Sequence, residues 1–344
     1  MGFYEGKKVF VTGHTGFKGS YLCLMLAQMG AKVRGYALEE PCGVFEAANI
    51  GDIVDSRIGD IRDFESLRRA FRDFNADIVI HMAAQPLVRE SYLRPRYTYE
   101  TNVMGTVNVL ECVRESDSVR SVVNVTTDKV YKNFEREEPY REDEMLDGHD
   151  PYSNSKSCSD IISHSYRASF FKENAVALSC ARAGNVIGGG DTAKDRLIPD
   201  CVRAVLAKKP IVVRNPESVR PFQFVAEPLM MYLLLAERQY TDIGFAGEYN
   251  IGPMEDECVS VMELVNMFCE AWGAGAQCVV RREKSVHEAN LLRLDSSKIR
   301  EKLCYAPLTS IGGAVQNVCE WTRAYAVGGD VRAVMEKQTE RYRI

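Results

Sequence analysis

The sequence lacks a long hydrophobic run and an excess of basic residues. Its longest notable apolar run, 229–236, is far shorter than the roughly 20 residues that an α-helix needs to cross a bilayer. Lysine and arginine total 43 against 48 aspartate and glutamate residues, which gives a formal net charge of −5. A surface that binds nucleic-acid phosphates would need a surplus of positive charge. We therefore expect neither a membrane-spanning segment nor a nucleic-acid partner.

The 11 cysteines form no CxxC pair and no cysteine–histidine cluster with the spacing of a zinc site. Residues 1–13 also lack the basic and apolar regions of a signal peptide. We expect buried, unpaired thiols in a reducing compartment, and hence a cytoplasmic protein without a metal site.

The composition is that of an ordinary folded protein, with 46% hydrophobic and 26% charged residues in 344. In the first half, short β-branched runs alternate with segments of helical period, which is typical of β-α-β units and a parallel sheet. The predicted strands are 8–12, 32–37, 78–82, 121–126 and 175–182, with helices over 20–29 and after a capping Asp63. The sequence therefore predicts an α/β fold with a doubly wound parallel sheet.

Three consecutive glycines at 188–190 interrupt this alternation. The residues after them combine short helices with loops rich in proline and arginine, while 248–251 again has the pattern of a strand. We expect a first domain over 1–185, to which the chain returns around 221–251. A smaller C-terminal α/β lobe would be made mainly of 186–344.

A glycine-rich loop follows the first predicted strand, with Gly13, Gly16 and Gly19 where the first helix begins. A dinucleotide diphosphate must approach the backbone closely, and the N–H groups at a helix start favour its negative charge. Placed between a strand and a helix, the GxxGxxG spacing predicts a Rossmann-type cofactor site. A tight turn with close helix packing is the alternative.

Further candidates for the cofactor site follow later strands. Asp60 is placed to accept a hydrogen bond from an adenine amino group, and Ala83 and Ala84 are small enough to let a flat cofactor pass. Core alanines would give the same pattern. No acidic residue closes the second strand, since Arg34 lies within it and the glutamates at 39–40 come late. We favour NAD over NADP.

A tyrosine and a lysine, Tyr152 and Lys156, lie four residues apart in a helix that Pro151 begins, so their side chains share one face. An ammonium beside a phenol lowers the phenol pKa from about 10 and makes it a usable base. An exposed helix pair is the alternative explanation of this spacing.

Polar residues also follow the fifth predicted strand, at the edge of the sheet where ligands bind in such folds. They are Thr126, Thr127, Asp128 and Lys129. Asn102 is a further polar residue within a segment that otherwise has the pattern of a packed helix.

Together these motifs resemble the extended short-chain dehydrogenase/reductase family, over nearly the whole chain. The resemblance implies that Tyr152 is the base and Lys156 its partner. It also implies that Thr126 hydrogen-bonds the substrate hydroxyl and that Asn102 positions a water near the lysine. The residues then expected to bind NAD are Gly13, Gly16, Phe17, Gly19, Asp60, Ile61, Ala83, Ala84, Tyr152 and Lys156.

Within that family, the chain is similar to a subgroup of nucleotide-sugar 4,6-dehydratases that act on CDP-glucose. The similar strings are GHTGFKGS, HMAAQPLVRESY, NVTTDKVY, GHDPYSNSK, ARAGNVIGGGD, DRLIPD and HEANLLRLDSSK. The resemblance implies oxidation at C4 of the sugar, loss of water across C5 and C6, and return of the hydride to C6. The product would be a 4-keto-6-deoxy sugar, as in deoxysugar biosynthesis for lipopolysaccharide O-antigen.

The resemblance also implies roles for the residues that would handle the sugar. Asp128 would be the acid toward the C6 oxygen and Lys129 the base at C5, while a lysine that only holds Asp128 in place is the alternative. The candidates for the substrate diphosphate are Arg89, Asn185, Arg196 and Arg220. Taken singly, each of these arginines could equally form a surface salt bridge.

Two enzymatic alternatives remain open: a dehydratase for another nucleotide sugar, and a 4-epimerase, which needs Tyr152 and Lys156 but no acid/base pair. A non-catalytic NAD sensor would have no need of the tyrosine. The family resemblance also implies a homodimer or a higher homo-oligomer, with 1–185 binding NAD and 186–344 mainly binding the nucleotide sugar.

Overall fold

The computed structural model of the protein describes residues 2–40, 43–254, 257–281 and 292–343. A seven-stranded parallel sheet lies at its centre, in the order β11-β6-β5-β4-β1-β2-β3. These strands are β1 (Lys8–Thr12), β2 (Lys32–Ala37), β3 (Asp55–Ile58), β4 (Ile78–His81), β5 (Ser121–Val125), β6 (Ala177–Ala183) and β11 (Glu248–Ile251). The strand order reverses between β1 and β4, which confirms the predicted doubly wound fold.

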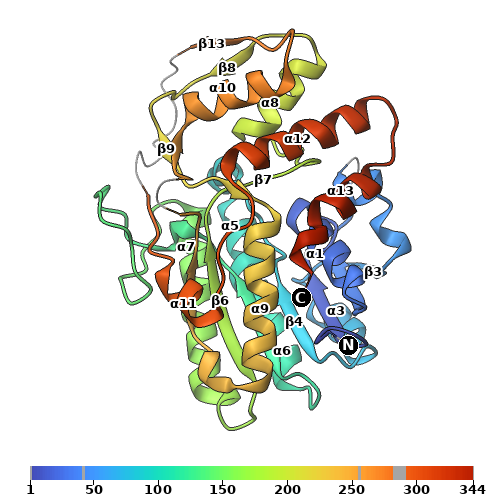
Figure 1. Ribbon diagram of the computed structural model, residues 1–344. Coiled ribbons are helices and arrows are strands. Elements are labelled where there is room, and N and C mark those ends of the chain that lie inside the picture. The colour runs from blue at the N-terminus through green and yellow to red at the C-terminus, as the bar shows by residue number, and fades with distance from the viewer. Residues whose placement is uncertain (1, 41–42, 255–256, 282–291, 344) are drawn as a thin grey trace.

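Helices cover both faces of the sheet, as Figure 1 shows. The α-helices of the described residues, in the lobe and around the sheet, are α1 (Phe17–Gln28), α2 (Val44–Ala47), α3 (Phe64–Arg72), α4 (Val88–Leu93), α5 (Pro95–Tyr99), α6 (Gly105–Arg114), α7 (Pro151–Tyr166), α8 (Leu197–Leu206), α9 (Ala226–Thr241), α10 (Val261–Trp272), α11 (Ser297–Leu303), α12 (Ile311–Ala326) and α13 (Val331–Thr339). Shorter helical turns are η1 (Ile50–Asp52), η2 (Glu100–Met104), η3 (Asp128–Val130), η4 (Arg167–Phe171), η5 (Ile243–Phe245) and η7 (Glu340–Tyr342).

Two hydrophobic clusters hold these layers together, one on each face of the sheet. The larger cluster joins α1, α9 and the C-terminal helices to the sheet, and the smaller one joins α3 and α6 to it. Strands covered on both faces show no alternation of buried and exposed residues, and every residue of β4, β5 and β6 is buried. This rigid sheet fixes the loops at its carboxyl edge.

A smaller lobe lies at one end of the molecule, at the top of Figure 1. It contains α8, α10 and a two-stranded sheet of β8 (Ile211–Val213) and β13 (Cys278–Val280). Short strand pairs lead to it: β7 (Val186–Ile187) with β10 (Gln223–Phe224), and β9 (Val219–Arg220) with β12 (Val259–Ser260). The strand predicted at 248–251 is present as β11 and pairs with β6.

Some element boundaries differ from the prediction. β6 begins at Ala177 and not at 175, because Ala175 has a φ of 54° and belongs to a turn. The first helix begins at Phe17, before the predicted residue 20, since Gly19 fits within the helix against the Gly13 carbonyl. Near the C-terminus, α13 packs against α1 and so returns to the first part of the chain.

Of the helices in the described part of the chain, none combines the length and the apolarity that crossing a membrane requires. The ten described cysteines form no disulfide with one another. Within the same residues, no group of three or more potential ligands is arranged to hold a metal ion.

Candidate active site

The glycine loop lies at the carboxyl end of β1 and passes close to the end of β4. Gly13 has a φ of +78°, and a Cβ there would come 2.8 Å from the Ala83 amide nitrogen. A Cβ at Gly19 would collide with the carbonyl oxygen of Gly13. The Thr12 hydroxyl accepts hydrogen bonds from the Met82 and Ala83 amides, 3.1 Å each, and so fixes the two strand ends together.

Helix α1 begins directly after this loop. Gly16 is its N-cap residue, and among the described residues no side chain caps the first turn. Uncapped N–H groups at a helix start favour an anion. The loop therefore fits the diphosphate of a dinucleotide, and its glycines leave the space that such a group needs.

The other predicted cofactor residues differ in their contacts and in how far their side chains are buried. The Phe17 ring lies against Gly188, and Ala84 is half-buried after β4. The Asp60 carboxylate accepts hydrogen bonds from the backbone and guanidinium of Arg62 at 2.5–3.1 Å, so its proposed contact with adenine remains a prediction. The Ile61 side chain is buried in the core of the sheet, which leaves only its backbone for a ligand.

Glu40 lies beside the glycine loop, although it comes after the end of β2. Its Oε2 atom would be 3.4 Å from a Cβ at Gly16. Burial and the charge of Asp191 raise the pKa of Glu40 above its ordinary value. Glu40 therefore places a carboxylate beside the glycine loop, although no acidic residue ends the second strand.

Tyr152 and Lys156 begin α7, whose N-cap Asp150 accepts a hydrogen bond of 3.0 Å from the Ser153 amide. Lys156 is buried and donates a hydrogen bond of 2.8 Å to the carbonyl of Val125, at the end of β5. Burial lowers the pKa of Lys156 to about 8 and raises the pKa of Tyr152 to about 12. The Lys156 ammonium is directed at a carbonyl in this conformation, so its expected lowering of the phenol pKa remains a prediction.

Two threonines follow β5, and they point in opposite directions. The Thr126 hydroxyl donates to Asp160 Oδ2 at 3.1 Å, away from the phenol. A hydrogen bond links the Tyr152 phenol to the Thr127 side chain. Successive side chains of an extended segment alternate, so only one of the two can face Tyr152. The structure thus corrects the predicted assignment of Thr126: the threonine beside the phenol is Thr127.

Asp128 and Lys129 continue from Thr127 into η3. The Thr127 hydroxyl donates to Asp128 Oδ1 at 2.8 Å, and Lys129 Nζ donates to the same oxygen at 3.0 Å. Asp128 is buried, whereas Lys129 keeps 28% of its side chain exposed. Tyr152, Thr127, Asp128 and Lys129 therefore form one hydrogen-bonded chain. The ion pair that the sequence left as an alternative for Lys129 is present.

Asn102 lies in η2 and is buried behind α7. Its side chain accepts from the Gln85 amide at 2.8 Å and donates to the Gln85 carbonyl at 3.1 Å. It also donates to Ser155 Oγ at 2.9 Å. These bonds tie the loop after β4 to the start of α7, while the water expected beside Lys156 remains a prediction.

Sequence reasoning missed Lys18, the second residue of α1. Its Nζ donates to the Tyr232 hydroxyl at 2.8 Å. Burial, with the charges of Lys156 and Arg196, lowers the pKa of Lys18 to about 7. Lys18 thus reaches from the glycine loop toward the residues after β5. A lysine at the start of an otherwise apolar helix was the available signal.

Two of the four predicted diphosphate residues are paired with carboxylates. Arg89 bonds Asp195 at 3.0 Å, and Arg196 bonds Asp191 at 3.1 Å. Arg220 lies on β9, and the Asn185 carbonyl accepts from the Gln223 amide at 3.1 Å. The structure therefore gives Arg89 and Arg196 anionic partners that a diphosphate would have to replace.

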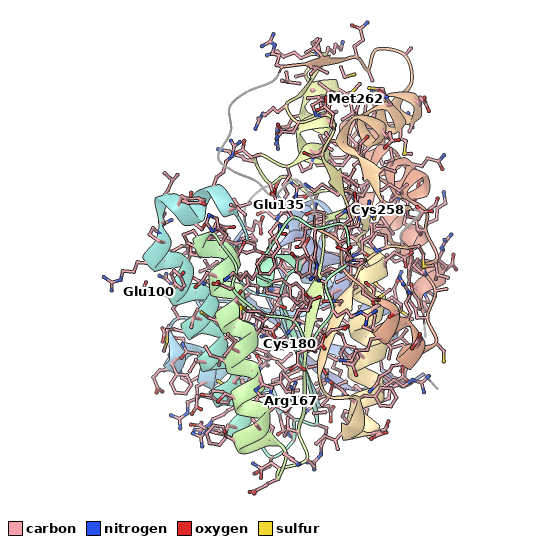
Figure 2. All side chains as sticks on the ribbon, turned by 90° about the vertical axis from the view of Figure 1, so that its left-hand side faces the viewer. Glu100, Glu135, Arg167, Cys180, Cys258 and Met262 are labelled. Carbon is pink, nitrogen blue, oxygen red and sulfur yellow. The ribbon has the colours of Figure 1, made fainter. Side chains whose placement is uncertain are left out.

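A pocket opens next to Asp128, and it contains an arginine that the prediction also missed. Arg293 lines this pocket, and its Nε is buried without a hydrogen-bond partner. Figure 2 labels Cys258, another lining residue, between the sheet and the small lobe. The lining residues are Pro139, Gly184, Pro221, Ile251, Gly252, Pro253, Cys258, Arg293 and Leu294. Part of the string HEANLLRLDSSK, residues 287–291, lies outside the described residues.

Comparison with known proteins identifies the family. A family model described as GDP-mannose 4,6 dehydratase matches residues 10–318. The chain belongs to this family. A relative from Salmonella typhimurium, CDP-glucose 4,6-dehydratase, is 45% identical over 348 residues, which cover 99% of this chain and 97% of the relative. The resemblance to the extended short-chain dehydrogenases/reductases is thereby confirmed.

Solved structures of this family's wider group share the fold. UDP-glucose 4-epimerase from Thermotoga maritima superimposes with a TM-score of 0.81 at 21% identity, covering 92% of this chain and 99% of that one. dTDP-glucose 4,6-dehydratase from Bacillus anthracis, solved with NAD, has a TM-score of 0.78 at 21% identity, covering 94% and 99%. At this identity the likeness supports the architecture alone.

Proposed function

We propose that the protein is an NAD-dependent CDP-glucose 4,6-dehydratase, which converts CDP-glucose into CDP-4-keto-6-deoxyglucose and water. The observation that carries this proposal is the hydrogen-bonded chain of Tyr152, Thr127, Asp128 and Lys129. It places a phenol next to an acid/base pair, in a chain that is 45% identical to an enzyme of this name.

The cofactor would be held by the glycine loop and the start of α1, with Ala83 and Ala84 beside it. When bound, NAD supplies the acceptor for the hydride that leaves C4 and the donor for its return to C6. Glu40 supports NAD over NADP, since a carboxylate beside Gly16 repels a further phosphate.

Oxidation at C4 requires a base for the 4-hydroxyl proton. Tyr152 takes this role, with Thr127 as its hydrogen-bond partner and Lys156 as the nearby cation. Because the phenol pKa is about 12 and the lysine pKa about 8, the phenolate needs the ammonium charge to form near neutrality. Lys156 must therefore be protonated for this step.

Elimination requires an acid for the C6 oxygen and a base for the C5 proton. A proton that passes from Lys129 Nζ to Asp128 Oδ1, over their 3.0 Å hydrogen bond, turns the ion pair into a carboxylic acid and a free amine. Asp128 can then protonate the leaving hydroxyl while Lys129 removes the C5 proton. This proton transfer supplies both the acid and the base, and it leaves the net charge of the pair unchanged.

The substrate diphosphate would bind between the two lobes. Arg293 lines the pocket and Arg220 immediately precedes the lining residue Pro221, while Arg196 and Arg89 can exchange their carboxylate partners for phosphate oxygens. We propose that 1–185 with 221–251 binds the cofactor, and that 186–344 mainly supplies this substrate surface, including Asn185 at its border.

We also propose a cytoplasmic homodimer. The absence of disulfides among the described cysteines supports a reducing compartment. Met104 on η2 and Ile161 on α7 are about half exposed on neighbouring helices, which supports a helical dimer face. Sedimentation of the purified protein at the mass of a monomer would contradict the dimer.

A panel of nucleotide sugars tests the substrate. The purified protein is incubated with NAD and with glucose linked to CDP, dTDP, UDP or GDP, and products are analysed by mass spectrometry. We expect loss of water from CDP-glucose at the highest kcat/KM, and none in Tyr152→Phe. Turnover of another nucleotide sugar without turnover of CDP-glucose rejects the cytidine assignment, and formation of a 4-epimer without loss of water rejects the dehydratase.

A further inference from the structure

A buried ion pair lies directly behind the candidate active site. Asp160 on α7 and Arg182 on β6 form two parallel bonds: Arg182 Nε to Asp160 Oδ2 at 3.0 Å, and Arg182 Nη2 to Asp160 Oδ1 at 2.8 Å. Each side chain is only 2% exposed. Cys180, labelled in Figure 2 on the same strand, donates to the Asp160 carbonyl from its thiol. The pair is thus enclosed by the sheet and α7.

Stability alone is a weak explanation for such a pair. Removing two charges from water costs about as much as their attraction returns, and buried pairs can often be replaced by apolar residues without loss of stability. Burial opposes the charge of Arg182, but the hydrogen bonds and charge of Asp160 hold the pKa of Arg182 above its ordinary value. The remaining hydrogen bonds of the pair therefore indicate what it does.

Two of these bonds go to the two ends of one short segment, 126–131, and a third runs from Arg182 Nη1 to the Glu142 carbonyl at 2.9 Å, beyond the segment. Thr126 Oγ1 donates to Asp160 Oδ2 at 3.1 Å, and Arg182 Nη1 donates to the Tyr131 hydroxyl at 2.8 Å. Asp128 and Lys129 lie between these two anchors. One ion pair therefore holds the start and the end of the segment that carries the acid/base pair.

The helix side of the pair is set by the register of α7. Tyr152, Lys156 and Asp160 are spaced by four residues and lie on one helix face. Lys156 bonds the carbonyl of Val125, and Asp160 bonds the next side chain, that of Thr126. The same helix face thus carries the phenol and fixes the segment after β5.

We propose that Asp160 and Arg182 are positioning residues for the elimination step, which hold Asp128 and Lys129 at the sugar by anchoring Thr126 and Tyr131. The inference rests on the proposed dehydratase function. C4 oxidation depends on the pair only through Thr127, because Tyr152 is fixed by the helix itself, whereas elimination depends on the pair through both Asp128 and Lys129. Loss of the anchors should therefore slow elimination more than oxidation.

The test is a double variant, Asp160→Leu with Arg182→Met, which removes both charges and both anchors without leaving an unpaired ion. We expect a melting temperature equal to or above that of the wild type. We expect elimination to fall by about 10- to 100-fold, as for a small misplacement of reacting groups. Single-turnover quench with C4-deuterated CDP-glucose measures the loss of label from C4 and the formation of the 6-deoxy product separately.

Two further variants complete the test. Tyr131→Phe removes one anchor only and should lower the ratio of elimination to oxidation in the same direction, but less. The matched control is Arg167→Met with Glu248→Leu, which removes a partly buried ion pair between η4 and β11, far along α7 from the segment. Figure 2 labels Arg167 in the lower part of the view, below Cys180. The control should leave both rates unchanged.

The outcomes separate the two proposals. A folded double variant that eliminates water at the wild-type rate overturns the positioning role. An equal fall in oxidation and elimination, in step with a lower melting temperature, also overturns it and leaves the pair a purely structural element. A wild-type protein that does not oxidise CDP-glucose at C4 refutes the proposed function itself, and this shows before any substitution is made.

Discussion

Replacing each of the two threonines after β5 by valine should give opposite results. Valine keeps the shape of threonine and removes only the hydroxyl. Thr127 lies in the hydrogen-bonded chain between Tyr152 and Asp128, whereas Thr126 bonds Asp160 behind the site. Thr127→Val should therefore slow oxidation at C4, while Thr126→Val should reduce stability and leave oxidation at C4 nearly unchanged.

The magnitudes follow from the groups that each hydroxyl contacts. A hydrogen bond to a charged group contributes about 1.5–3 kcal/mol, and each 1.4 kcal/mol in a barrier is about a factor of ten. Thr127→Val should slow the loss of label from C4-deuterated CDP-glucose by about 10- to 100-fold. Thr126→Val should lower the free energy of unfolding by about 1.5–3 kcal/mol and change oxidation at C4 by less than about threefold.

Single-turnover quench gives the rate of C4 oxidation, and urea denaturation gives the free energy of unfolding. A protein in which Thr126→Val stops oxidation and Thr127→Val does not would refute the placement of the two side chains. It would restore the assignment that the sequence suggested.

Three other predictions concern pH, stability and cofactor choice. The pKa of Lys156 is lowered to about 8, so its ammonium is present below that pH. We therefore expect kcat to fall as the pH rises through about 8. An unchanged kcat up to pH 10 would contradict the need for this charge. Buried Glu227 accepts hydrogen bonds from two tyrosines and two amides at 2.5–2.9 Å. In urea titrations, Glu227→Gln should lower the free energy of unfolding by about 2–4 kcal/mol, and Tyr342→Phe should lower it by about 1 kcal/mol. Equal losses in the two variants would argue against Glu227 as the acceptor shared by these hydrogen bonds. Glu40→Ala should raise the affinity for NADP relative to NAD by about tenfold in binding titrations, and an unchanged ratio rejects its part in cofactor choice.

The sequence predicts the scaffold of the site well, because local rules decide it. Gly13 is required by a positive φ and a close approach to Ala83, and a strand before it and a helix after it are visible in the pattern. Pro151 and the cap at Asp150 place Tyr152 at the start of α7. The strand at 248–251 is likewise found from its pattern.

The direction of individual side chains could not be predicted from the sequence. Whether Thr126 or Thr127 faces the phenol depends on where β5 ends, and a shift of one residue reverses the answer. The contact of Lys156 with a carbonyl depends on the distance between α7 and β5. Lys18 is marked only by its place at the start of an apolar helix, and Arg293 reaches the site from a distant segment that no local pattern marks.

The path of the hydride tests the central claim most directly. A mixture of CDP-glucose deuterated at C4 and CDP-glucose carrying carbon-13 in the hexose is converted by the wild-type protein, and the products are resolved by mass spectrometry and NMR. If one closed site carries out both redox steps, the deuterium appears at C6 of molecules without carbon-13. Deuterium in the carbon-13 product, or its retention at C4, would contradict the account.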